Sequence, residues 1–226
     1  MKISFGAFCA ATAALAAVTL LPGAANAGII SINDKAGFLA ASGATSATGA
    51  IPIAGASLAS LTVGSVTFSQ VAANSLNFSI DWTSRIAGNQ FAINGLEDLD
   101  VDFGGDVFSF GFDFVEPEND PNVNAPFVDS TFEISLCDDG LCFETLQFSV
   151  ANDIAAFIGV ISALAFDQVL IREIIGDIEN EFFGEFYTST TPVSEIPLPL
   201  AAPLFLVGLA GLSSVARRRK RAKITD

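Results

Sequence analysis

The sequence predicts an all-β protein: an antiparallel β-sandwich, jelly-roll-like, with an N-terminal signal helix and a single C-terminal transmembrane helix. In the middle of the chain, short segments alternate apolar and polar residues, as half-buried strands do, and Gly- and Asp-rich turns separate them. Both ends are long apolar stretches, the second followed by a basic cluster. The 226 residues therefore divide into a signal peptide (1–27), an ectodomain (28–190) and a C-terminal segment (191–226).

Residues 1–27 have the three parts of a secretory signal peptide. Lys2 supplies the positive start, and an apolar stretch runs from Ala7 to Leu21. Ala25 and Ala27 then form a small-x-small cleavage site. We expect signal peptidase to cut after Ala27, so that the exported chain begins at Gly28.

The C-terminal segment predicts a membrane anchor. Residues 200–216 are apolar and uncharged, and a basic stop follows at once: Arg217, Arg218, Arg219, Lys220 and Arg221. An apolar span with a basic cytoplasmic flank is oriented with its N-terminal side outside. The span is short, because about 20 residues are needed to cross a bilayer, and residues 196–199 extend it.

A proline motif made of Ile196, Pro197, Leu198 and Pro199 precedes this span. Motif, short apolar helix and Arg cluster together resemble the PEP-CTERM class of sorting signals, in the variant that begins Val-Pro-Leu-Pro-Ala. The resemblance implies processing by an exosortase, a membrane enzyme that cuts near the motif. It also implies a precursor in the inner membrane, a mature protein at the cell surface or outside the cell, and a producer of exopolysaccharide or biofilm matrix. An ordinary single-pass anchor is the alternative.

The first part of the ectodomain predicts a short strand over 28–32 and a brief helix capped by Asn33 and Asp34 and ending near Ala41. Residues 42–60 are rich in Gly, Ala, Ser and Thr and show no period, which favours a loop or a weak edge. Residues 61–71 alternate and predict one strand.

The centre predicts a hairpin. Leu99, Val101 and Phe103 alternate with acidic residues in a strand over 96–103, and a turn is expected at 104–106. The next strand, 107–114, should place one row of side chains in the core. These are Phe108, Phe110, Phe112 and Phe114.

A second hairpin is predicted from strands over 131–137 and 142–150, with a bulge after Glu144. Cys137 and Cys142 flank its turn at a spacing that a disulfide can bridge, and export favours oxidation. Two further strands are expected over 167–175 and 181–189, and residues 188–192 should form a stalk before the sorting motif.

Four pieces of the ectodomain are similar to a recurrent bacterial ectodomain found with this sorting signal. They are residues 93–97, 110–117, 157–162 and 181–184. The similarity implies the same sandwich and no particular ligand.

Charge and composition exclude several functions. Residues 28–195 hold 24 acidic and three basic residues, a formal charge of −21, which repels nucleic-acid phosphates. The chain has no His, which excludes Ser-His-Asp and Cys-His catalysis and His-containing zinc sites.

Two acidic groups suggest a calcium site, because calcium prefers carboxylate and other hard oxygen ligands. One is the stripe Asp98, Asp100 and Asp102, and the other is the loop group Glu116, Glu118 and Asp120. Alternate residues of a strand stand about 6.6 Å apart, so the loop has the better chelating geometry. A solvated acidic face without metal is the alternative, and no other cofactor is expected.

Trp82 and Tyr187 are candidate platforms for stacking a sugar ring, or else ordinary core and rim residues. We therefore expect a non-catalytic adhesion or glycan-associated module whose partner is exopolysaccharide. Divalent cations would have to bridge the acidic ectodomain to an anionic polysaccharide. The alternatives are a purely structural envelope or matrix protein and, less favoured, a glycoside hydrolase that uses two of the carboxylates.

Overall fold

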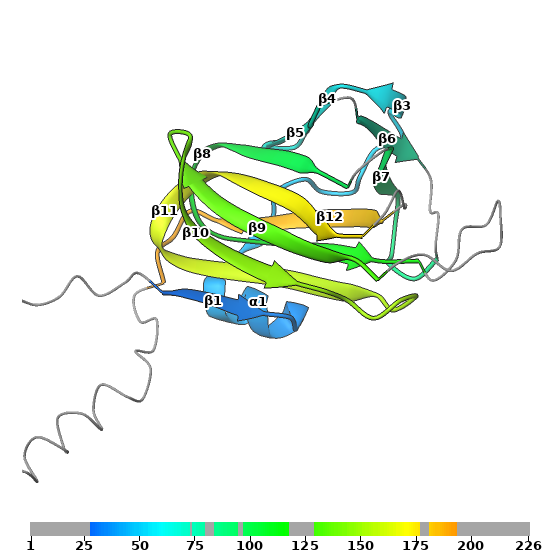
Figure 1. Cartoon of the computed structure of the whole chain (residues 1–226). Helices are drawn as coiled ribbons and strands as arrows, with labels where there is room; N and C mark the ends of the chain where they lie inside the picture. Colours follow the sequence, from blue (N-terminus) through cyan, green and yellow to red (C-terminus); the bar gives the residue numbers. More distant parts are fainter. Residues whose placement is uncertain are drawn as a thin grey trace, which may run out of the picture.

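The computed structural model describes residues 28–72, 74–79, 84–94, 97–117, 129–176 and 181–193. They form a β-sandwich in which twelve antiparallel strands and one short helix are described (Figure 1). The sandwich predicted from the sequence is thereby confirmed. In these ranges no helix has the length and apolar character needed to cross a membrane.

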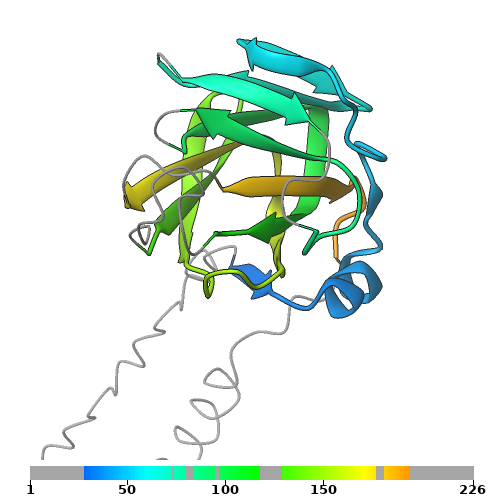
Figure 2. The same cartoon turned by 90° about the vertical axis from the view of Figure 1, so that its right-hand side faces the viewer.

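The N-terminal strand and helix are confirmed. Strand β1 (Ile29–Ile32) pairs with β11, and helix α1 (Lys35–Ser42) follows. The Asp34 carboxylate caps the helix by accepting from the Gly37 N–H at 2.7 Å. Gly43 ends it in the left-handed conformation, with φ of 64°. Figure 2 shows β1 and α1 together at one end of the molecule.

The segment after the helix contains more structure than expected. Strands β2 (Thr45–Ser46) and β3 (Gly55–Leu58) lie where a loop or a weak edge was predicted, and β3 is the last strand in the order of the sheet. The single strand expected over 61–71 is a hairpin of β4 (Ser60–Val63) and β5 (Val66–Gln70). Its turn requires Gly64, where φ is 62° and an added Cβ would lie 2.1 Å from the Ala47 carbonyl oxygen. Because the turn has only two residues, the alternation of apolar and polar residues continues through it. The sequence pattern therefore could not reveal the turn.

The central hairpin prediction is wrong. Strand β8 (Leu99–Val115) runs through the expected turn as one strand of 17 residues. Gly104, with φ of 69°, bends the strand, and the register against β11 shifts at the corresponding place. The pair of glycines therefore marks a bend that carries the chain from one layer into the other.

Strand β11 (Ala156–Ile175) is also longer than predicted, since it joins the expected strand over 167–175 to residues 156–166. The predicted hairpin of β9 (Thr131–Asp138) and β10 (Leu141–Phe148) is confirmed. Its irregularity lies between Cys142 and Glu144, just before the place expected.

Strand β12 (Phe182–Ser189) corrects the predicted stalk. Thr188 pairs with Phe110 and Thr45, and Ser189 pairs with Ser109, so both belong to the sandwich. With β6 (Ser75–Ser79) and β7 (Gln90–Asn94), the order along the sheet is β10-β9-β11-β8-β12-β7-β6-β3. The strands form one continuous ladder because β8 pairs with β5, β11 and β12.

Phenylalanine dominates the core. Eleven phenylalanine side chains are less than 2% exposed: Phe38, Phe68, Phe78, Phe91, Phe110, Phe112, Phe114, Phe132, Phe166, Phe183 and Phe186. Three of the four phenylalanines predicted to line β8 are among them, whereas Phe108, near the bend, is only partly buried. At the centre, Phe112 stacks on Phe186 with ring centroids 5.1 Å apart.

The chain enters and leaves the sandwich at the same level of the sheet. Ile30 pairs with Ile161, Ile161 with Ser109, and Ser109 with Ser189. One transverse row of the sheet therefore contains both ends, three strand spacings or about 14 Å apart. Ile30 and Val193 also pack against the same small apolar cluster.

Candidate functional site

Several predicted sites lie outside the described residues. These are the signal cleavage residues Ala25 and Ala27, the sorting motif Ile196–Pro199, the basic stop Arg217–Arg221, and the candidate ligands Trp82, Glu118 and Asp120. Gly28, the expected mature N-terminus, is described and precedes β1 directly.

The predicted disulfide is confirmed. Cys137 and Cys142 are register partners across the β9–β10 hairpin and are bonded to each other. The link encloses only the hairpin turn, so it reinforces this turn locally.

The acidic stripe before and within β8 does not form one site. The Asp100 carboxylate pairs with the Arg172 guanidinium. Asp102 accepts from the Gly104 N–H at 2.7 Å and so holds the bend. Asp98 Oδ1 instead accepts from the Glu173 N–H at 3.1 Å. Each carboxylate has a separate structural partner.

A different group of acidic side chains gathers at the end of the sandwich where β8 ends and β12 begins. It contains Glu97, Glu116, Ser130, Glu173 and Glu181, and we call it the acidic pole. All but Glu173 have fully buried side chains. The members come from positions before β8, after β8, before β9, within β11 and before β12. Five segments of the chain, in or beside four strands, therefore contribute to one small region.

Ser130 is the centre of the acidic pole. Its backbone N–H donates to Glu116 Oε1 at 2.6 Å. Its hydroxyl oxygen lies 3.1 Å from Glu173 Oε1 and 3.0 Å from Glu181 Oε1. The second oxygen of Glu173 accepts from the Glu97 N–H at 3.3 Å. Three carboxylates thus meet one serine.

The surroundings of Glu116 make the ionisation of its carboxyl group costly. Burial raises the pKa of Glu116 above its ordinary value, the hydrogen bond from the Ser130 N–H opposes the rise, and the charges of Asp129 and Glu173 add to it. Glu116 Oε2 is fully buried and has no hydrogen-bond partner among the described residues. Such an atom in a native protein calls for a physical explanation.

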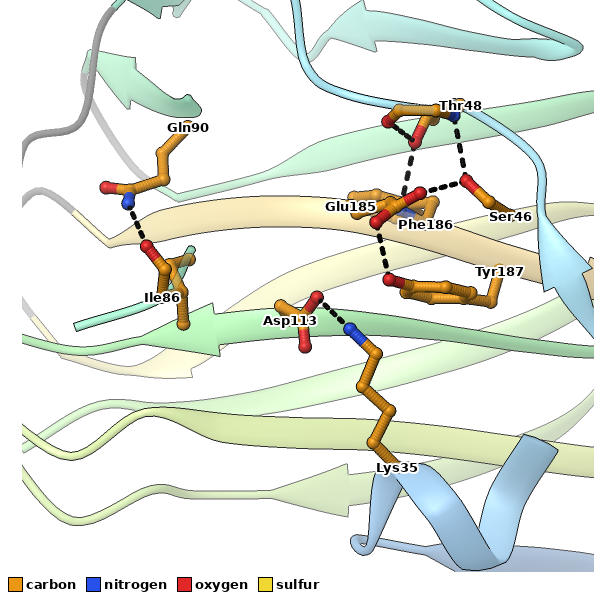
Figure 3. Close-up of polar contacts among 10 residues, drawn as sticks. Lys35, Ser46, Thr48, Ile86, Gln90, Asp113, Glu185, Phe186 and Tyr187 are labelled. Carbon is orange, nitrogen blue, oxygen red and sulfur yellow. Dashed lines mark hydrogen bonds and ion pairs between the residues drawn. The ribbon is translucent and has the colours of Figure 1, made fainter. Parts of the chain in front are cut away.

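A second polar group lies between α1 and the sandwich (Figure 3). The Lys35 ammonium is 2.7 Å from Asp113 Oδ2 and 4.3 Å from the centre of the Tyr187 ring. The Tyr187 hydroxyl donates to Glu185 Oε2 at 2.6 Å, and the Ser46 hydroxyl donates to Glu185 Oε1. Burial and the bond to Glu185 raise the pKa of Tyr187.

This arrangement bears on Tyr187 as a sugar-stacking residue. The side chain is only 7% exposed, Lys35 lies over its ring, and the Phe157 ring packs against it edge-on at 6.0 Å. Stacking a sugar on Tyr187 would require Lys35 to move. In this arrangement, the contact of Lys35 with Asp113 joins α1 to β8, and the contact of Ser46 with Glu185 joins β2 to β12.

The acidic pole was only partly foreseen. Glu116 and Asp98 were proposed as calcium ligands on sequence grounds, and both lie at or beside it. Glu173 and Glu181 were missed because they are far from these residues in the sequence, and Glu97 was missed although it adjoins Asp98. Among the residues that the structure describes, no three His, Cys, Asp or Glu side chains are placed so that they could hold a metal ion.

No protein-family model and no curated protein matches the sequence. Among solved structures, the chain is similar to a mutant of a family 29 carbohydrate-binding module, at 12% identity and a TM-score of 0.36, covering 70% of this chain and 99% of the other. It is also similar to the family 11 carbohydrate-binding module from Clostridium thermocellum in complex with a β-1,3-1,4-mixed-linked tetrasaccharide. That match has 11% identity and a TM-score of 0.34, and covers 61% of this chain and 97% of the other.

Proposed function

We propose that the chain is an exported, non-catalytic protein of the bacterial cell surface or biofilm matrix, delivered through its C-terminal sorting signal, and that its sandwich associates with exopolysaccharide. The observation that carries the proposal is the position of the chain ends. Ile30 and Ser189 share one row of the sheet, about 14 Å apart.

That geometry suits a precursor with a signal segment at one end and an apolar anchor at the other. While both segments are still attached, one membrane must accommodate both ends of the folded body. Because both ends of the sandwich lie on the same row of the sheet, the ectodomain can stay folded while both segments are in the membrane. The acidic pole then lies at the opposite end of β12, roughly 25 Å from Ser189, on the side away from the membrane.

The negative charge of the ectodomain determines how it can bind a polysaccharide. A formal charge of −21 over residues 28–195 repels anionic sugars directly. Divalent cations that bind carboxylates on both partners would remove this repulsion. We therefore propose a cation-bridged association rather than a pocket that encloses one sugar.

The test is retention of the secreted protein on the exopolysaccharide of the producing cells, in calcium and in EDTA. Retention in calcium that EDTA abolishes supports the proposal. Retention that EDTA leaves unchanged contradicts the cation bridge and leaves direct glycan binding. No retention in either buffer contradicts glycan association and favours the structural alternative, and cleavage of the polysaccharide would instead identify a hydrolase.

A further inference from the structure

The Ser130 hydroxyl lies between two carboxyl groups of the acidic pole. Its oxygen is 3.1 Å from Glu173 Oε1 and 3.0 Å from Glu181 Oε1. A hydroxyl has one hydrogen, so it can donate a full hydrogen bond to only one of two ionised carboxylates. If one of the two carboxyl groups carries a proton, that group donates to Ser130 and Ser130 donates to the other. Glu173 and Glu181 each have a further interaction, which leaves the single hydrogen of Ser130 unchanged.

Glu116 adds a third carboxyl group beside the same serine. Its Oε1 accepts from the Ser130 N–H at 2.6 Å, and its Oε2 is fully buried without a hydrogen-bond partner among the described residues. Burial raises the pKa of Glu116, the bond from Ser130 opposes the rise, and the charges of Asp129 and Glu173 add to it. Ionisation of all three carboxyl groups at once is therefore costly.

Carboxyl groups outnumber cations at this end of the sandwich. The cations are Arg85, which pairs with Asp153, and Arg172, which pairs with Asp100. The Asp153 N–H donates to the Glu116 carbonyl oxygen at 2.7 Å. Even if both arginines were counted in full, the six carboxyl groups in and beside the acidic pole would leave four negative charges. A proton held on one carboxyl group relieves such repulsion. The six are Glu97, Asp98, Glu116, Asp129, Glu173 and Glu181.

We propose that the acidic pole is a pH-sensitive contact: one proton, shared between Glu173 and Glu181 through the Ser130 hydroxyl, holds the strand ends together, and its loss at higher pH loosens them. Ser130 precedes β9, Glu173 lies within β11, and Glu181 precedes β12. Glu116, which follows β8, is bonded to the same serine. These four strands are neighbours in the order β9-β11-β8-β12. The shared proton therefore acts on the middle of the sheet.

The stability of the fold should fall as the pH rises. A carboxyl group whose pKa is raised on folding contributes stability that is fully present below its unfolded pKa and is lost as the pH rises through its folded pKa. Exposed carboxyl groups are already ionised above about pH 5.5, so they add little slope there. The sandwich would thus be most rigid in acidic surroundings, whether or not it binds a glycan.

Thermal unfolding of the full-length chain, followed in EDTA from about pH 5.5 to about pH 8.5, tests the proposal. We expect the unfolding temperature to fall by about 3–5 °C per pH unit until the proton is lost, and then to level off. Protection of the backbone amides at the ends of β8 and β9, corrected for the intrinsic effect of pH on exchange, should fall over the same range.

Glu181→Gln and Glu173→Gln should each remove most of this slope and raise the unfolding temperature at the alkaline end of the range. The amide of glutamine can donate to Ser130 at every pH, whereas the carboxyl group donates only while it keeps its proton. Glu133→Gln is the matched control. It removes a carboxylate of β9 that accepts from Gln147 Nε2 at 3.3 Å, outside the acidic pole, and should keep the wild-type slope.

A wild-type unfolding temperature that stays constant over this range would overturn the proposal. A wild-type slope in both the Glu181 and the Glu173 variant would also overturn it, because the proton would then belong to another group, such as Asp113, whose pKa is raised by burial. The measurement needs neither polysaccharide nor processing of the chain. Its failure would therefore leave the retention experiment and the proposed function untouched.

Discussion

The Lys35 ammonium lies 2.7 Å from Asp113 Oδ2 and so fastens α1 to the long strand β8. Burial raises the pKa of Asp113 above its ordinary value, and the hydrogen bond and charge of Lys35 oppose this rise. Lysine and aspartate are 78 positions apart in the sequence. The pair therefore links the N-terminal end of the described body to the middle of the sandwich.

Replacing Lys35 by Met should reduce stability more at neutral than at acidic pH. A carboxyl whose pKa is raised on folding contributes stability below its unfolded pKa, and this contribution is lost as pH rises through the folded pKa. Without Lys35 the pKa rises further, so the loss grows. Since Lys35 is 37% exposed, we expect about 0.5–1 kcal/mol at pH 7 and less at pH 3, measured by urea unfolding. In an Asp113→Asn background the pH dependence of the Lys35 effect should disappear, and its persistence would contradict this explanation.

The aromatic core should be sensitive at its centre and tolerant near the bend of β8. Phe112 contacts five other phenylalanine rings: Phe110, Phe114, Phe148, Phe183 and Phe186. Phe112→Ala should cost about 3–5 kcal/mol in the free energy of unfolding. Phe108→Ala, on the same strand but only partly buried, should cost clearly less. Equal losses in denaturant unfolding would contradict the core assigned here.

The phenylalanines of β8 illustrate which features of the fold the sequence could predict and which it could not. Alternation of Phe110, Phe112 and Phe114 identifies a strand and its buried face without any knowledge of its partners. The same pattern could not show whether Gly104 turns the chain back or only bends it, because both cases need a positive φ. The pairing of β8 with β11 decides between them, and that contact is long-range.

Only part of the acidic pole could be predicted, for a related reason. Glu116 and Asp98 stood out because other acidic residues are close to them in the sequence. Glu173 and Glu181 reach Ser130 only through the order of the strands in the sheet. The disulfide was predictable, by contrast, because Cys137 and Cys142 are local to one hairpin.

Gly159→Ala should displace the N-terminal strand and helix. An added Cβ would lie 2.6 Å from Phe38 Cδ2 and 2.7 Å from the Ile32 carbonyl oxygen, and the backbone contact cannot be relieved by a side-chain rotation. We expect a loss of about 1–3 kcal/mol and faster hydrogen exchange in α1. Gly105→Ala is the control, because its Cβ would meet nothing within 4 Å. Wild-type exchange in α1 of the Gly159 variant would rule out this packing.

Removal of the disulfide should have a small and local effect. The bond closes a loop with a sequence separation of five, for which the chain-entropy estimate is about 2 kcal/mol. Cys137→Ala with Cys142→Ala should therefore lower stability by no more than this amount and speed exchange chiefly at the β9–β10 turn. Alanine is used because Cys137 is fully buried and a serine hydroxyl there would need a partner. A loss of cooperative unfolding would show that the bond supports the whole fold.

Processing of the precursor should depend on the two prolines of the sorting motif. Replacing Pro197 and Pro199 together by Ala should leave full-length precursor in the inner membrane, because the proposed processing enzyme recognises the proline motif ahead of the apolar span. The measurement is fractionation of the producing cells, followed by detection of the ectodomain in membrane, surface and medium. Pro192→Ala, outside the motif, should be processed like the wild type. Normal release of the double variant would favour an ordinary membrane anchor, while retention of both variants would point to a general defect in export.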